Sequence, residues 1–213
     1  MSLYKRKRHI TLVVLPLVGI CLFVILFMIA TLQYTSGLET SASDLGFNFK
    51  ENYLCDLLDT NTLDGSINPA HLTARIALII ICFSLILFWY ELPKLFPVKS
   101  NTLTIMQTTG ILSMVILLFL ATGNHDVIIR VSGFFGLLAV ISILIELYKA
   151  DLFGLFIFGF FLLAMFLTNY YIYETGILLD RLPLIQKITF VICFSWFVIL
   201  NSILYLRLKH SNS

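Results

Sequence analysis

The sequence has few charged residues: Asp, Glu, Lys and Arg together make up 12% of its 213 positions. Soluble domains carry about 25% charged residues, and nucleic-acid-binding domains depend on clusters of basic ones. Hydrophobic residues make up 59% of the chain, with a mean hydropathy of +0.96. The composition therefore excludes a soluble domain, a disordered chain and a nucleic-acid-binding protein, and it predicts a protein of the lipid bilayer.

Cysteine is also scarce, with four residues and no Cys-x-x-Cys or Cys/His metal-binding spacing. Three of the four lie inside apolar runs, and only Cys55 lies in a polar segment. No pair is suggested for a disulfide, so we expect reduced thiols that pack as small apolar groups.

Six apolar runs are long enough to cross about 30 Å of hydrocarbon as helices, which takes about 20 residues. They cover residues 10–32, 72–90, 103–121, 127–147, 152–172 and 183–206. None alternates with period two, so helices fit and barrel strands do not. The sequence predicts an all-α polytopic membrane protein with a single six-helix transmembrane domain over residues 1–213.

The first run follows the basic residues 5–8, as the core of a signal peptide does. A cleaved signal has a core of only about 7–15 residues, so we expect an uncleaved anchor. If the N-terminus is cytoplasmic, nine of the 14 Lys and Arg residues lie on the cytoplasmic side and nine of the 12 Asp and Glu residues lie outside. The positive-inside rule then predicts cytoplasmic termini and an external loop over residues 33–71.

The second half of this loop carries an apolar stripe at helical spacing. The stripe consists of Tyr53, Leu54, Leu57 and Leu58. It predicts a short amphipathic helix, and we expect residues 47–58 to fold back onto the outer end of the bundle. Docking would bring Glu51 and Asp56 close to basic residues, which we expect to favour the charged forms of the carboxylates.

The same segment resembles a known family. The matching residues are Phe47, Phe49, the run Glu51-Asn52-Tyr53-Leu54-Cys55-Asp56-Leu57-Leu58, Asn61, Gly65 and Asn68-Pro69-Ala70, with His125-Asp126 as a second feature. They are similar to an uncharacterised bacterial multipass membrane protein family, catalogued as domain of unknown function 998. The resemblance implies a six-helix protein of the bacterial plasma (inner) membrane, and no established activity comes with it.

The middle of each run contains no Asp, Glu, Lys, Arg or His. Charged residues in the middle of a membrane commonly mark ion and proton paths. Their absence from the middle of these runs makes a transporter a less favoured prediction. Small residues recur four apart on two of the predicted helices. These are Thr109 and Ser113 on one helix, and Ser132, Gly136 and Val140 on the next. They predict close helix packing.

Polar residues gather instead at the predicted outer ends of the helices. Glu51, Asp56, His71, His125 and Asp126 are the candidate catalytic residues, and a cluster of them would suit a zinc-type metal through His71, His125 and Asp126. Arg75 and Arg130 are candidates for binding lipid or another anion. The alternative is structural: Asn124 and Asn68 fit helix N-caps, with Pro69 at the first helical position, and Asp126 with Arg130 fits an ordinary ion pair at i,i+4.

Two functions follow. The first is a structural or lipid-interacting membrane protein at the outer face, whose partner is the bilayer or a small ligand and which needs no cofactor. The alternative is a metal-assisted hydrolase of a lipid in the outer leaflet, with a divalent metal as cofactor. The sequence leaves open whether the protein is an enzyme, its substrate, its oligomeric state and the order of its helices in the bundle.

Overall fold

The protein is all-α, and six of its helices are long and apolar enough to cross a membrane. The computed structural model describes residues 3–34, 46–62, 65–122 and 124–210, and these contain no strand. The long helices are α1 (Leu3–Gln33), α2 (His71–Glu91), α3 (Asn101–Leu117), α4 (His125–Lys149), α5 (Phe153–Thr175) and α6 (Leu182–His210). Four short 3₁₀ helices accompany them: η1 (Leu54–Leu57), η2 (Leu92–Leu95), η3 (Leu118–Thr122) and η4 (Leu179–Arg181).

Most of the long helices extend past the predicted runs, although α3 ends at Leu117 and continues to Thr122 as the 3₁₀ helix η3. The predicted run 10–32 is the apolar part of a helix that begins at Leu3, and the run 183–206 belongs to a helix that ends at His210. Hydropathy marks only the part of a helix that suits hydrocarbon, whereas the backbone hydrogen bonds continue through the flanking polar residues.

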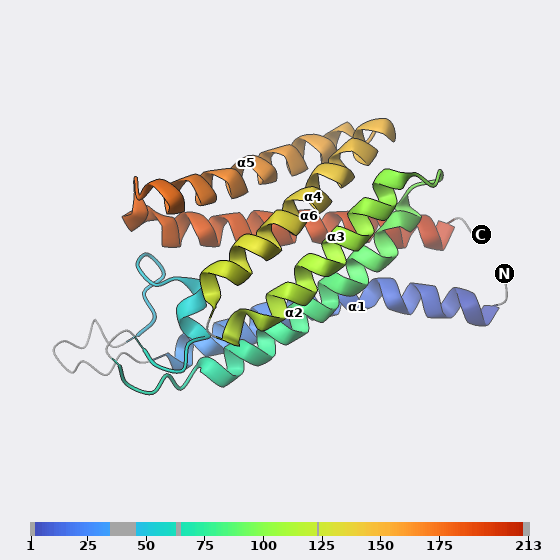
Figure 1. Ribbon diagram of the computed structural model, residues 1–213. Helices are drawn as coiled ribbons and strands as arrows, with labels where there is room; N and C mark the ends of the chain where they lie inside the picture. The colour runs from blue at the N-terminus through green and yellow to red at the C-terminus, as the bar shows by residue number, and fades with distance from the viewer. Residues whose placement is uncertain (1–2, 35–45, 63–64, 123, 211–213) are drawn as a thin grey trace.

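The six helices form a closed ring, in which each helix packs against the next along the chain and α6 packs against α1 (Figure 1). Inside the ring, α2 meets α6 through Phe88 and Phe197, whose ring centroids lie 4.9 Å apart. The start of α1 and the end of α6 lie at one end of the bundle, here called the terminal end (Figure 1). Residues 46–62 and 65–70 and the α5–α6 connection lie at the opposite end, here called the loop end.

Small residues allow close packing between α3 and α4, as predicted. The hydroxyl of Ser113 donates a 2.8 Å hydrogen bond to the backbone carbonyl oxygen of Ser132. A Cβ atom on Gly136 would lie 3.2 Å from the Ser113 Oγ, closer than ordinary van der Waals contact. The predicted stripe therefore serves helix contact, as small residues commonly do in membranes.

Residues 46–62, here called the docked segment, fold back onto the loop end. Leu57 is fully buried and Leu58 is 6% exposed, while Tyr53 and Leu54 are half-buried. The prediction that residues 47–58 dock on the bundle is confirmed. The short helix is a single 3₁₀ turn at Leu54–Leu57.

Candidate functional site at the loop end

Asn68 holds the docked segment to the start of α2. Its side chain is fully buried, and its Nδ2 atom lies 3.1, 3.3 and 2.8 Å from the carbonyl oxygens of Asp56, Leu57 and Asp59. Its Oδ1 atom accepts a 2.9 Å hydrogen bond from the backbone N–H of Ala70. The prediction that Asn68 is the N-cap of α2 with Pro69 at the first helical position is wrong, because α2 begins at His71 and Ala70 occupies the N-cap position.

The start of α6 supplies the second attachment. The ammonium of Lys187 donates a 2.5 Å hydrogen bond to the backbone carbonyl oxygen of Asn52. It also lies 5.4 Å from the ring centroid of Phe47, within the range of a cation–π contact. Gln186 accepts a 3.3 Å hydrogen bond from the backbone N–H of Leu54. Two adjacent residues of α6 thus contact the docked segment at several points.

Asp56 organises the turn within the segment. Its Oδ2 atom accepts hydrogen bonds from the backbone N–H of Tyr53 at 2.8 Å and from the side-chain amide of Asn52 at 3.4 Å. Burial nevertheless raises the pKa of Asp56 above its ordinary value, and these hydrogen bonds and the charge of Lys187 oppose that shift only in part. The expectation that nearby cations favour the charged form of Asp56 is wrong, because desolvation is the larger effect.

Cys55 lies next to Asp56 in the same turn. Burial raises the pKa of its thiol to about 12, and the charge of Asp56 adds to that shift. The thiol is therefore protonated at neutral pH and unreactive, as expected for a structural cysteine.

The first turns of α2 also fasten the segment. The Nδ1 atom of His71 lies 2.6 Å from the carbonyl oxygen of Asn68, so Nδ1 carries the hydrogen. Arg75 donates from Nε to the carbonyl oxygen of Leu58 at 3.0 Å and from Nη2 to the hydroxyl of Thr60 at 3.1 Å. Of the two predicted site residues, Arg75 therefore bonds to the docked segment, whereas His71 bonds to Asn68 just before α2.

Asp126 and Arg130 contact a different element, the last turn of α5, and His125 contacts Asp126. Asp126 Oδ1 accepts a 2.9 Å hydrogen bond from the hydroxyl of Tyr173 and lies 3.5 Å from Nδ1 of His125. Arg130 forms its ion pair with Glu174 on α5, at 2.9 Å. Asn124 occupies the N-cap position of α4, but its side chain makes no capping hydrogen bond.

The predicted site residues thus fall into two groups. Asp56, His71 and Arg75 bond within the docked segment and the start of α2, and Glu51 is exposed on that segment. The other three bond to α5 or to one another. Within residues 3–34, 46–62, 65–122 and 124–210, no three His, Cys, Asp or Glu side chains are placed to hold a metal ion. The expected five-residue metal cluster does not form there: Asp56 bonds within the docked segment, and Asp126 bonds to Tyr173 of α5.

Comparison with models of protein families, with curated proteins and with solved structures finds no match to the chain. The function proposed below therefore rests on the chemistry of the described residues.

Two buried carboxylates at the terminal end were not singled out from the sequence. Glu91 is fully buried and forms an ion pair with Lys94. Glu146 is 5% exposed and accepts hydrogen bonds from the hydroxyl of Ser100 at 2.9 Å and from the ammonium of Lys149 at 3.0 Å. The repeated Glu-x-x-Lys spacing at the ends of α2 and α4 was the available signal, since residues at i and i+3 share a helix face.

Proposed function

We propose that the chain is a structural membrane protein that binds lipid headgroups at the loop end. Six apolar helices embed it in a bilayer. The observation that carries the proposal is how the ionisable residues at the loop end are used. Arg75 and Lys187 hold a short segment over α2 and α6, and Asp56 and His71 bond to the backbone nearby instead of lining an open metal site. This arrangement supports a packed cap over the helix ends.

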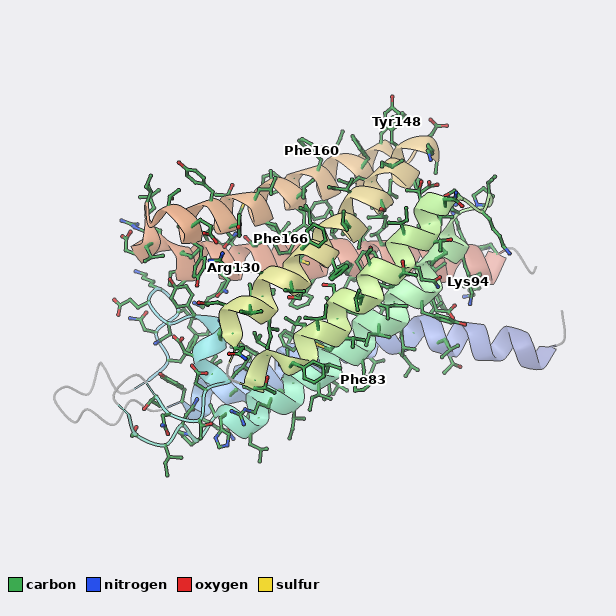
Figure 2. All side chains as sticks on the ribbon, viewed as in Figure 1. Phe83, Lys94, Arg130, Tyr148, Phe160 and Phe166 are labelled. Atoms are coloured by element: carbon green, nitrogen blue, oxygen red, sulfur yellow. The ribbon has the colours of Figure 1, made fainter. Side chains whose placement is uncertain are left out.

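Arg130 is the group best placed to bind a lipid headgroup. Its side chain is 52% exposed, and the pair with Glu174 engages only part of a guanidinium that has five N–H donors. Three exposed tyrosines occupy the last turns of α5 beside it: Tyr170, Tyr171 and Tyr173. Tyrosine is enriched where a membrane meets water, and arginine binds phosphate through paired hydrogen bonds. Figure 2 shows Arg130 near the start of α4, at the loop end.

The test measures the phospholipids that remain bound to the purified protein. We expect Arg130→Gln to retain at least twofold less anionic phospholipid than the unmodified protein. Arg181→Gln is the matched control, because Arg181 is also exposed and pairs only with its neighbour Asp180. Equal retention in both variants and in the unmodified protein would contradict the proposal.

Metal analysis separates this proposal from the hydrolase hypothesis. The proposal predicts equal and negligible divalent metal in the purified protein and in a His71→Ala/His125→Ala double variant. Metal that is bound stoichiometrically by the unmodified protein and lost from the double variant would instead favour a metal-assisted hydrolase of lipid.

Orientation and origin belong to the same proposal. The distribution of Lys and Arg supports cytoplasmic termini, and the motif around Asn52 and Asp56 supports a bacterial inner-membrane protein of the uncharacterised family named above. Reporter fusions at each terminus test the orientation, and a C-terminal reporter that is active only outside the cytoplasm would refute it.

A further inference from the structure

A groove runs between α4 and α5 on the outer surface of the bundle, toward the terminal end. It is a shallow, open groove with a volume of about 510 Å³. Its walls include Ile141, Leu144, Ile145 and Tyr148 from α4 and Phe156 and Phe160 from α5. Figure 2 labels two of these side chains, Phe160 and, closer to the terminal end, Tyr148. The walls are apolar apart from the residues at the mouth.

The groove has the depth of one leaflet. Its mouth lies at Lys149, the last residue of α4, and its deepest residue on that helix is Ile141. Eight residues of α-helix rise about 12 Å, and one leaflet contributes about half of the 30 Å hydrocarbon thickness. The groove thus opens at the level of the lipid headgroups and ends before the middle of the bilayer.

The bilayer determines what fills such a groove. If the groove were empty, the atoms of its walls would lack dispersion contacts. Water would not fill it, because the site offers no hydrogen-bond partners. The surrounding solvent is hydrocarbon chains, because the helices on both sides of the groove are embedded in lipid. We propose that the α4–α5 groove binds one acyl chain of a phospholipid from the leaflet at the terminal end.

The mouth of the groove fits the other end of that lipid. The ammonium of Lys149 has three N–H donors, and its bond to Glu146 uses one of them. Tyr148 is 58% exposed at the same level, where tyrosine contacts the headgroup region of membranes. A lipid phosphate above the mouth can therefore accept a hydrogen bond from Lys149 while its chain lies between the helices.

A buried tryptophan lies directly behind the groove and can report on its contents. A Cβ atom on Gly159 of α5 would lie 2.7 Å from the indole ring of Trp196 and 2.8 Å from Leu144, which lines the groove. Trp196 is fully buried, so lipids elsewhere around the bundle do not touch it. The other tryptophan, Trp89, packs against Gly110 on α3 instead.

The experiment uses the full chain with Trp89→Phe, so that Trp196 is the only tryptophan, in vesicles of phosphatidylcholine brominated near the middle of the acyl chain. We expect bromine to quench Trp196 fluorescence. Filling the groove by Ile145→Phe should reduce the quenching at least twofold. Ile157→Phe is the matched control, because Ile157 is exposed on α5 but does not line the groove. Ile141→Phe repeats the block if Ile145→Phe does not fold.

Two outcomes would overturn the proposal. The first is quenching that is negligible, or that is equal in the blocking and control variants. The second is a dimer that persists at high lipid-to-protein ratio and is lost on Ile145→Phe, because a second copy would then fill the groove. The test is independent of the lipid proposal for the loop end, which depends on Arg130 at the opposite end of the bundle.

Discussion

The side-chain amide of Asn201 on α6 donates a 2.6 Å hydrogen bond to the backbone carbonyl oxygen of Val13 on α1. Both residues are fully buried. The contact lies one turn before Pro16, which lacks an N–H and therefore leaves the carbonyl of Leu12 without its usual helical donor. Asn201 thus joins α6 to α1 beside the point where Pro16 interrupts the helical hydrogen bonds of α1.

Replacing Asn201 with Ala should lower the free energy of unfolding by about 1 kcal/mol, since interhelical hydrogen bonds in membranes contribute about 0.6–1.7 kcal/mol. Thermal or denaturant unfolding in detergent measures the change. Ser202→Ala is the control, because the Ser202 hydroxyl bonds only to the carbonyl of Val198 in its own helix. Equal losses in the two variants would contradict a role for the Asn201–Val13 bond.

Gly159→Ala should destabilise the contact between α5 and α6. The added methyl group would meet the indole ring of Trp196 and the side chain of Leu144, and both are buried. Overpacking of this kind costs about 1–3 kcal/mol, which unfolding in detergent can resolve. Gly154→Ala on the same helix has nothing within 4 Å of its new methyl group and should leave stability unchanged. An unchanged free energy of unfolding in Gly159→Ala would contradict tight packing of Gly159 against Trp196.

Asn68→Ala should release the docked segment. It removes the amide that lies within hydrogen-bonding distance of three loop carbonyls, one of them in a buried contact and two in part-buried ones. We expect the labelling rate of Cys55 by a membrane-impermeant maleimide to rise about tenfold or more, which corresponds to about 1.4 kcal/mol of docking free energy. Asn61→Ala, at an exposed position of the same segment, is the control. Labelling that is already fast in the unmodified protein would contradict the docked arrangement.

Asp56 should make docking depend on pH. Burial raises its pKa in the folded protein above the ordinary value of 3.8, so the docked state binds the proton more tightly than the released state does. The stabilisation is therefore complete below that ordinary value and is lost as the pH rises through the raised pKa. Hydrogen exchange of the segment's amides should show weaker protection, relative to Asp56→Asn at each pH, as the pH increases from about 4 to 7. A constant ratio between the two proteins would refute the shift.

The sequence predicted the six helices because each apolar run is long, uniform and separated from the next. It also predicted that residues 47–58 dock, because the apolar stripe with Leu57 and Leu58 had to be buried somewhere. These predictions depend on composition and period alone. They do not require knowing which helices are neighbours.

The candidate site could not be placed by the same means. His71 and His125 were expected at one membrane level, but their positions around the ring depend on helix order, which hydropathy does not encode. The sequence also did not reveal that Asn68 binds the docked segment, since an Asn-Pro pair before a helix is typical of an N-cap. Its actual partners are carbonyls of the segment at residues 56–59, brought there by tertiary packing.

The closed ring of helices has a consequence for how the protein is made. The partners in the bond between Val13 and Asn201 are separated by 188 positions in the chain. A ribosome delivers α1 to the membrane long before α6 exists, at about 5–20 residues per second. During that interval the face of α1 that later packs on α6 has only lipid, α2 or the insertion machinery beside it. Completion of the bundle therefore waits for the last helix to emerge.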